Sequence, residues 1–294
     1  MRLNFLSKEN KKKEVEEVVK LVNAKKTKHK KVEKKQKVTV KKEKNVKRTV
    51  KERREHLSRR VKSGIPGLDE LMGGGFLPHS VVLVTGKTGS SKTIVSAQFL
   101  YKGIIDHNEN GIYITTEQRA DDIADDMLTS FGWDFHKLMD EKKLSIIEID
   151  PGNVRQLPYL VKQKIEEIGA KRVVIDSTSM FSLFFDDVFE TRRKLFSVYK
   201  ILKDMDIVTL FTAEILEESK GLSRFGVIEF MVDGIIALQF IGIAAKFKRA
   251  LMVRKMRRTD HSNKIYPFEI TNKGIVVRKI WRKKRLLKKE RARG

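Results

Sequence analysis

The sequence predicts an α/β protein with a mainly parallel, twisted sheet, helices on both faces and antiparallel strands at its C-terminal end. Two observations lead to this fold class. Between residues 80 and 214, apolar runs of strand length alternate with longer segments of helical periodicity, as in repeated β-α units. After residue 232, four strand-like runs follow one another with only turns between them, which favours antiparallel pairing.

The alternating elements follow from their periodicity and their boundaries. A strand is expected where a short run rich in Val and Ile precedes a glycine or a carboxylate, and a helix where apolar residues recur as Ala97, Leu100 and Ile104 do. Gly132 has the position of a glycine that ends a helix. In chain order the expected elements are SVVLVTG (80–86, strand), KTIVSAQFLYKGII (92–105, helix), GIYITTE (111–117, strand), ADDIADDMLTSFG (120–132, helix), KLSIIEID (143–150, strand), VRQLPYLVKQKIEEIGA (154–170, helix), KRVVIDS (171–177, strand), ETRRKLFSVYKILKDM (190–205, helix) and IVTLFTAE (207–214, strand).

The C-terminal strand-like runs are DGIIALQF (233–240), ALMVRKMR (250–257), PFEIT (267–271) and GIVVRK (274–279). The longest apolar stretch, 234–245, is too short to cross a bilayer and is expected to be a buried strand. The start of the chain lacks the apolar run of a secretory signal. The absence of cysteine excludes disulfides and thiolate metal sites. We therefore expect a cytoplasmic protein without a membrane span.

The net charge of +25 is concentrated at the two ends of the chain. Residues 1–62 carry 25 Lys and Arg against 8 Glu, and residues 278–294 carry 10 Lys and Arg against one Glu, which leaves a net charge of −1 for residues 63–277. We therefore predict a basic low-complexity tail over 1–62, one folded domain over 63–278 and a basic tail over 279–294.

The tails admit two interpretations. Valines at 15, 18, 19 and 22 have helical spacing and predict a short amphipathic helix within the first tail. Clustered lysine and arginine would bind nucleic acid or another polyanion through counterion release. Alternatively, the tails are solvated, solubilising segments, since no aromatic residues are interleaved with the N-terminal lysines.

The segment GKTGSSKT (86–93) nearly matches the phosphate-binding template G-x-x-x-x-G-K-[ST], but it has Ser91 where the template has glycine. The segment follows an apolar strand and opens a helix, where backbone N–H groups and the helix dipole can hold phosphate oxygens. Lys92 would reach the β- and γ-phosphates, and the Thr93 hydroxyl would hold Mg²⁺. The residues expected to bind phosphate are Gly86, Lys87, Thr88, Gly89, Ser90, Ser91, Lys92 and Thr93.

Two further residues decide how well this loop would work. Ser91 adds a Cβ and a hydroxyl where the backbone passes close to the phosphate, but it keeps its N–H, so we expect a working, weakened site. Asp176 ends the strand RVVID, where it would organise the metal ion. An aspartate that merely ends a strand is the alternative. Together the motifs predict binding of ATP and Mg²⁺.

Several segments in the right order resemble the KaiC-like branch of the RecA superfamily of ATPases, in its single-domain archaeal form. These segments are SGIPGLDELMGGGFLPHSVVLVTGKTGSSKTIVSAQFLYKG (63–103), GIYITTEQ (111–118), RVVIDS (172–177), SRFGVIEFMVDGIIAL (223–238) and VRKMRRTDHSNKIYPFEITNKGIVV (253–277). The resemblance covers roughly 63–278 and implies a RecA-like P-loop fold. It also implies a ring, usually a hexamer, with ATP between neighbouring subunits.

The resemblance also assigns roles to individual residues. Glu117 matches the glutamate that orients or deprotonates the attacking water, while Gln118 stands where the family has a second acidic residue. Lys255, Arg257 and His261 match residues that reach the neighbouring subunit's γ-phosphate, and strand alternation places Lys255 and Arg257 on one face. The positions expected to line the nucleotide are Met256, Thr259, Thr271 and Asn272.

Three functions remain open at this point. The leading hypothesis is a Mg²⁺-dependent ATPase that acts as a ring motor or a nucleotide switch, with Lys92, Glu117, Lys255 and Arg257 as its catalytic residues. A nucleic-acid-binding RecA relative that uses its basic tails is the second, and an ATP-binding scaffold with little turnover is the third. Self-phosphorylation is not expected, because Glu229 and Phe230 occupy the positions where some family members carry hydroxyl residues.

Overall fold

The computed structural model describes Glu55 and residues 58–149, 156–179, 187–216, 221–223, 228–243 and 246–278. The chain divides into two compact units, Met1–Ser58 and Arg59–Gly294, and the elements described below belong to the second unit. The helix expected over 15–22 and the C-terminal tail 279–294 lie outside the described residues. The boundaries predicted at 62 and 278 therefore stay predictions.

In the described part of the chain, nine strands form a sheet in the order β3-β2-β4-β5-β1-β6-β7-β8-β9. The strands β1 to β6 pair in parallel, and β7, β8 and β9 add antiparallel pairs at one side. This arrangement confirms the predicted fold class. The bounds are β1 Val81–Gly86, β2 Gly111–Thr115, β3 Leu144–Glu148, β4 Arg172–Asp176, β5 Val208–Glu214, β6 Gly234–Ile243, β7 Lys246–Met256, β8 Ile265–Thr271 and β9 Gly274–Val277.

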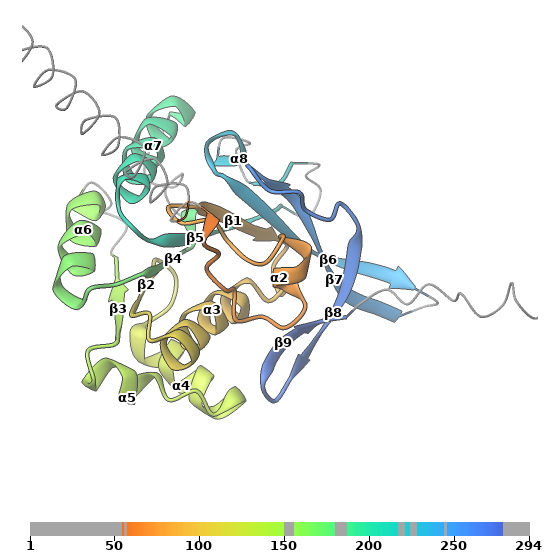
Figure 1. Cartoon of the computed structure of the whole chain (residues 1–294), viewed down its shortest axis with the longest axis horizontal. Helices are drawn as coiled ribbons and strands as arrows, with labels where there is room; N and C mark the ends of the chain where they lie inside the picture. The colour runs from red at the N-terminus through yellow and green to blue at the C-terminus, as the bar shows by residue number, and fades with distance from the viewer. Residues whose placement is uncertain are drawn as a thin grey trace, which may run out of the picture. The chain divides into compact units, whose positions relative to one another are not determined.

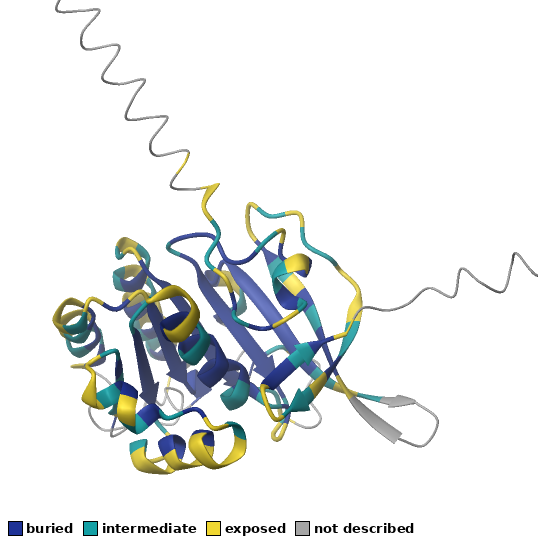
Figure 2. Cartoon of the chain, turned by 60° about the horizontal axis from the view of Figure 1, so that its bottom comes forward, coloured by how far each residue is buried: buried dark blue, intermediate teal, exposed yellow. Residues whose placement is uncertain are grey.

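Helices cover both faces of the parallel part of the sheet (Figure 1). One apolar cluster joins the sheet to α2 (Leu68–Leu71), α3 (Lys92–His107), α4 (Ala120–Phe131) and α5 (Phe135–Asp140). A second cluster joins the opposite face to α6 (Leu157–Ile168), α7 (Val188–Asp204) and α8 (Ile228–Met231). Figure 2 shows the strands buried between helices whose outer surfaces are exposed.

The helices form where local signals and burial agree. On α6, Leu157, Val161 and Ile165 recur every four residues and are buried against the sheet. Gly132 ends α4 in the left-handed conformation, and its N–H donates to the Leu128 carbonyl oxygen, as a helix-ending glycine does.

The structure also contains elements that the sequence patterns did not indicate. The helices α2, α5 and α8 span four to six residues, too few to establish a helical period. The strand β2 ends at Thr115, before Glu117, and β6 runs on to Ile243. The stretch 234–245, expected to be a buried strand, is buried from Gly234 to Leu238, whereas Phe240 is exposed.

A buried ion pair ties the central helix to the sheet. The Arg172 guanidinium on β4 is fully buried and donates from Nε and Nη2 to Oε2 of Glu109, at 2.8 and 2.7 Å. Its Nη1 donates to the Phe99 carbonyl oxygen of α3 at 2.8 Å. Because this charge is removed from water, its partners are needed for stability.

The parallel strands present their carboxyl ends along one edge of the sheet. In the strand register, Gly86 of β1 lies beside Glu214 of β5, and Thr115 of β2 lies beside Asp176 of β4. Ligands of open parallel sheets bind at such an edge. No helix within the described residues is long and apolar enough to cross a membrane.

Candidate nucleotide-binding site

The loop that joins β1 to α3 lies at this carboxyl edge. Gly86 ends β1, and a Cβ at this position would lie 2.4 Å from Ser90 Oγ and 2.7 Å from the Leu238 carbonyl oxygen. Only glycine fits there. The segment between Gly86 and Lys92 therefore makes a tight turn that ends where α3 begins. The amino end of this helix lies at the carboxyl edge of the sheet, where its N–H groups can bind an anion.

Ser91, the residue that departs from the template, takes up the backbone conformation of a glycine. Its φ of 79° and ψ of 27° are left-handed, and its side chain makes no hydrogen bond to the first turn of α3. A residue with a Cβ is strained in this region, whereas glycine is not. The loop thus follows the path that the template glycine would follow, at a conformational cost.

Lys92 lies almost buried at the start of α3 and folds back over the loop. Its Nζ donates to the carbonyl oxygens of Gly86 at 3.1 Å and Lys87 at 3.2 Å. A carboxylate oxygen of Glu214 lies 3.8 Å from the same nitrogen. Burial lowers the pKa of Lys92, and the nearby carboxylates of Glu214, Asp176 and Glu117 oppose this shift. A bound anion would therefore stabilise the charged form of the buried Lys92 side chain.

Asp176 ends β4 beside the first turn of α3. The Thr93 hydroxyl donates to Oδ2 of Asp176 at 3.1 Å, and the Tyr113 phenol donates to the same oxygen. The Thr212 hydroxyl donates to Oδ1. Burial raises the pKa of Tyr113 well above its usual range, so the phenol stays a neutral donor. These donors hold the carboxylate beside the Thr93 hydroxyl.

The pairing of Thr93 with Asp176 fits a magnesium ion. A hydroxyl at the helix start and a carboxylate at the neighbouring strand end are the oxygen groups that hold Mg²⁺ in P-loop proteins. At 3.1 Å the two oxygens already lie on one side of the cavity. These two residues would hold the ion, with the phosphates and water completing its shell.

Glu117 follows β2 and faces the same cavity. The Ser177 hydroxyl donates to Oε1 of Glu117, which fixes the carboxylate relative to the end of β4. The turn that carries it is closed by Thr115, whose hydroxyl donates to the Gln118 carbonyl oxygen at 2.9 Å and accepts from the Gln118 N–H at 3.0 Å. A carboxylate in this place can hold a water molecule against a phosphate.

These groups surround one cavity of about 520 Å³, within the usual range for small-molecule sites. It is lined by Thr88, Gly89, Ser91, Lys92, Thr93, Ile94, Thr115, Glu117, Gln118, Asp176, Ser177, Glu214, Arg249 and Ile270. Most of the predicted phosphate-binding loop lines this cavity, and Lys92, Thr93, Glu117 and Asp176 meet there. Gly86 and Ser90 are buried and do not line the cavity, and Lys87 contributes a carbonyl oxygen that accepts from Lys92.

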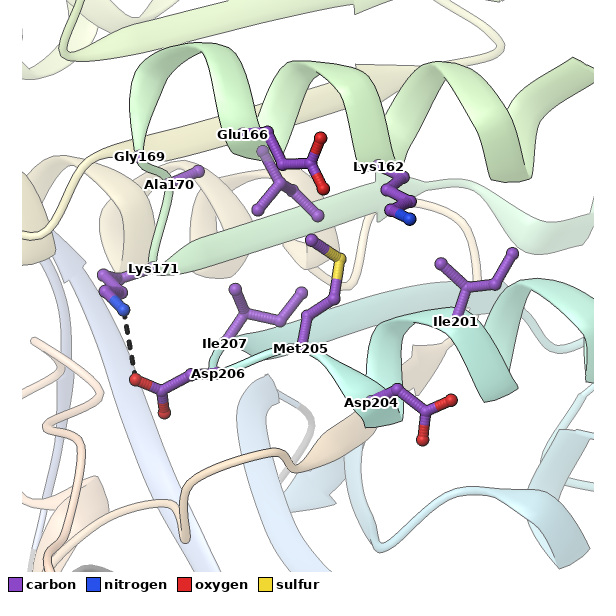
Figure 3. A pocket seen from close by; sticks show the side chains of 11 residues that line it. Lys162, Glu166, Gly169, Ala170, Lys171, Ile201, Asp204, Met205, Asp206 and Ile207 are labelled. Carbon is purple, nitrogen blue, oxygen red and sulfur yellow. Dashed lines mark hydrogen bonds and ion pairs between the residues drawn. The ribbon is translucent and has the colours of Figure 1, made fainter.

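A second cavity of about 530 Å³ lies at the opposite edge, between α6 and α7 (Figure 3). It adjoins the amino ends of β4 and β5, where Lys171 Nζ donates to Oδ2 of Asp206 at 3.0 Å. Nucleotides bind at the other end of such strands. The second cavity is therefore not the candidate nucleotide site.

The predicted cations Lys255, on β7, and Arg257, just after it, do not line the cavity of their own chain. The Lys255 ammonium donates to the carbonyl oxygens of Glu229 at 2.9 Å and Val232 at 2.8 Å, around α8. The Arg257 guanidinium donates to the Phe230 carbonyl oxygen at 3.0 Å. Burial, followed by the charge of Arg257, lowers the pKa of Lys255. Both cations thus point to α8.

The remaining predicted positions also lie away from this cavity. Met256 is buried, and the Thr259 hydroxyl accepts from Arg60 Nη1 at 2.8 Å. His261 Nδ1 lies 3.2 Å from the Ser262 carbonyl oxygen, Thr271 ends β8, and Asn272 belongs to the turn that follows it. Their roles toward a nucleotide stay predictions. So does binding of nucleic acid by the tails, most of which lie outside the described residues.

Six cavity residues were not predicted as site residues. Ile94, Thr115, Ser177 and Ile270 lie within two positions of predicted ones, whereas Glu214 and Arg249 do not. Glu214 ends the strand IVTLFTAE as Asp176 ends RVVID, so the same criterion could have indicated it. Arg249 and Ile270 come from β7 and β8, far from the loop in sequence, and no local signal marks them. Tyr113 and Thr212, which hold Asp176, are likewise found only through strand order.

The sheet order and the site define the class. A glycine-containing loop between a buried parallel strand and a helix, with carboxylates at the adjacent strand ends, defines a P-loop nucleotide-binding protein with a RecA-like fold. The family described as "ATPase: KaiC" matches residues 61–281. The chain belongs to this KaiC-like ATPase family, as the sequence motifs predicted.

Individual relatives agree with this assignment. A UPF0273 protein of Methanocaldococcus jannaschii is 39% identical over 236 residues, covering 74% of this chain and 96% of that protein. The circadian clock oscillator protein KaiC of Synechococcus elongatus is 34% identical over 228 residues, which are 74% of this chain but only 44% of KaiC. The chain thus matches less than half of the clock protein's length.

Comparison with a solved structure also supports the fold. The crystal structure of a KaiC-like protein from Pyrococcus horikoshii matches with a TM-score of 0.70 and 42% sequence identity. The match covers 75% of this chain and 99% of that chain. The single-domain type that the sequence resembled is therefore confirmed.

Proposed function

We propose that this protein is a cytoplasmic, Mg²⁺-dependent ATPase that forms rings and hydrolyses ATP between neighbouring subunits, as a motor or a nucleotide switch. One observation carries the proposal. Lys92, Thr93, Glu117 and Asp176 come from three separate segments and converge on one cavity at the carboxyl edge of the sheet. Their types and places match those needed for phosphoryl transfer to water.

Each group has a distinct role in this mechanism. The loop N–H groups and the Lys92 ammonium bind and neutralise the β- and γ-phosphates. Thr93 and Asp176 would hold a Mg²⁺ ion, which would supply positive charge against the phosphates. The hydroxyl groups of Tyr113 and Thr212 donate to the Asp176 carboxylate and keep it in place.

Glu117 is the residue that acts on the attacking water. Its carboxylate can accept a hydrogen bond from the water and orient its lone pair toward the γ-phosphate. The Ser177 hydroxyl occupies Oε1 of Glu117, which leaves Oε2 to hold the water. The neighbouring Gln118 is neutral and lines the cavity without adding a second negative charge beside the phosphates.

The positions of Lys255 and Arg257, at the end of β7 and just after it, support a ring. Lys255 and Arg257 lie at α8 and not in the cavity of their own chain. A second copy that packs against the open carboxyl edge would bring these two cations to the γ-phosphate. A cation in that position contributes roughly 10³- to 10⁵-fold in rate. In the KaiC-like family the corresponding residues have this role, and we assign it to them here.

Hydrolysis measurements test the nucleotide site. Purified protein should release phosphate from ATP only with Mg²⁺, and Lys92→Ala should abolish release. Its size in solution should be that of a ring, usually a hexamer, when ATP is present. Unchanged turnover in Lys92→Ala would end the proposal, whereas tight ATP binding without turnover would favour a nucleotide-dependent scaffold.

Mixing two inactive variants tests the shared site. Lys92→Ala and Arg257→Ala should each be inactive alone, the second by roughly 10³-fold. In a mixed ring, about a quarter of the sites pair an intact Lys92 with an intact neighbouring Arg257, so activity should return. Arg254→Ala, which removes an exposed cation three residues before Arg257, is the matched control and should be active alone. No recovery on mixing would contradict hydrolysis between subunits.

A further inference from the structure

The Glu214 carboxylate reaches the groups of the loop that a polyphosphate needs. Its Oε1 accepts from the Thr88 hydroxyl at 3.2 Å and lies 3.8 Å from Lys92 Nζ. We propose that Glu214 is an internal competitor of the nucleotide phosphates, which must displace it from Lys92 and Thr88 in order to bind. This inference rests on the proposed function and adds a residue that sets phosphate affinity.

Hydrogen bonds fix the backbone of Glu214, so only its side chain can move away when a phosphate binds. Its N–H donates to Ser179 Oγ at 2.9 Å, and it lies beside Gly86 in the parallel register of β5 and β1. The next residue, Ile215, donates from its N–H to the Gly86 carbonyl oxygen at 3.2 Å. The pairing of β5 with β1 therefore places the Glu214 carboxylate beside the loop.

The surroundings of Lys92 explain the pairing. Its side chain is 9% exposed, and an ammonium buried to that extent is stabilised by a nearby negative charge. The Glu214 carboxylate, whose Oε1 lies 3.8 Å from the Lys92 ammonium, supplies such a charge. Glu214 thus provides part of the counter-charge that a phosphate would otherwise provide.

The same geometry makes the carboxylate replaceable. The Glu214 side chain is 38% exposed, and its charge contact with Lys92 is longer than a hydrogen bond. A phosphate group carries more charge and can accept from the loop N–H groups as well, which Glu214 cannot do at once. With both present, two anions face one ammonium, so Glu214 turns toward solvent and its repulsion weakens binding.

The competition concerns polyphosphate and not the base. Ligands that reach Lys92, such as ATP and inorganic tripolyphosphate, must displace Glu214, whereas adenosine has no group that reaches it. Removing the charge while keeping the shape should therefore strengthen binding of both polyphosphates by a similar factor. We expect roughly fivefold, near the upper end of what partly exposed charge pairs contribute.

The test uses the full-length protein and titration calorimetry with inorganic tripolyphosphate, MgATP and adenosine. Glu214→Gln keeps the acceptor oxygen and removes the charge. Glu167→Gln is the matched control, since Glu167 pairs with Lys164 on the exposed side of α6. Glu214→Gln should bind tripolyphosphate and MgATP roughly fivefold more tightly than wild type, with adenosine binding and the control unchanged. A gain in affinity cannot come from misfolding.

Two outcomes would overturn the inference. Unchanged or weaker polyphosphate binding by Glu214→Gln would assign Glu214 to another role, such as holding the metal or water. An equal gain in adenosine affinity would indicate a general rearrangement of the cavity. Lys92→Ala tests the phosphate site independently of Glu214. If Lys92→Ala binds tripolyphosphate as tightly as wild type, the proposed site is refuted; if only Glu214→Gln fails to bind more tightly, the competition by Glu214 is refuted and the site is not.

Discussion

Replacing Ser91 with glycine is expected to stabilise the folded protein. Ser91 has a φ of 79°, where a side chain with a Cβ clashes with the following carbonyl oxygen. This conformation costs a non-glycine residue about 1–2 kcal/mol. Glycine removes that cost but also adds about 0.4–1 kcal/mol of conformational freedom to the unfolded chain. The free energy of unfolding should therefore rise by about 0.5–1 kcal/mol.

The measurement is thermal or urea unfolding of the nucleotide-free protein, with Ser91→Ala as the matched control. For a domain of this size the midpoint temperature of Ser91→Gly should rise by roughly 1–4 °C. Ser91→Ala removes only the hydroxyl and keeps the Cβ, so its stability should stay within about 0.5 kcal/mol of wild type. If alanine stabilised as much as glycine, or if glycine destabilised, the backbone argument would be refuted.

Three further predictions follow from single contacts. Glu109→Ala leaves the buried Arg172 guanidinium without its carboxylate and should lower the free energy of unfolding by about 3 kcal/mol in urea titrations, so a loss below about 0.5 kcal/mol would contradict the buried pair. The hydrogen bond that His136 Nε2 donates to the Asp125 carboxylate, 2.8 Å long, raises the pKa of His136, so this contact stabilises the fold below the ordinary pKa of histidine, and its contribution is lost as pH rises through the raised one. An NMR titration should show this raised midpoint and its return toward the ordinary value in Asp125→Asn; equal midpoints would contradict the contact. Asp176→Asn should raise the Mg²⁺ concentration for half-maximal ATP turnover by about 10- to 100-fold, and unchanged Mg²⁺ dependence would remove Asp176 from the metal site.

Much of the parallel half of the fold could be predicted because its signals are local. The apolar run ending at Gly86, the helical period that follows it and the run ending at Asp176 each lie within one short segment. Their convergence also follows, since parallel strands place their carboxyl ends at one edge. Lys92, Thr93 and Asp176 therefore meet as the sequence indicated.

The rest of the site depends on strand order, which local patterns do not contain. Placing β5 between β4 and β1 brings Glu214 to the loop and the Thr212 hydroxyl to Asp176. The direction of Lys255 and Arg257 depends on α8, a single helical turn without a detectable period. No spacing within the sequence encodes these contacts.

The sequence alone determined that this protein is α/β and that it belongs to the KaiC-like ATPases, and it predicted a phosphate-binding loop that begins at Gly86. Those properties depend on residues that are neighbours in the chain, where period, turn chemistry and motif spacing act directly. Only the tertiary structure decided that the Glu214 carboxylate lies 3.8 Å from the Lys92 ammonium and that Lys255 and Arg257 donate to carbonyl oxygens around α8. Such contacts join residues more than a hundred positions apart or depend on short irregular turns, and pairing across the sheet, not local preference, sets them.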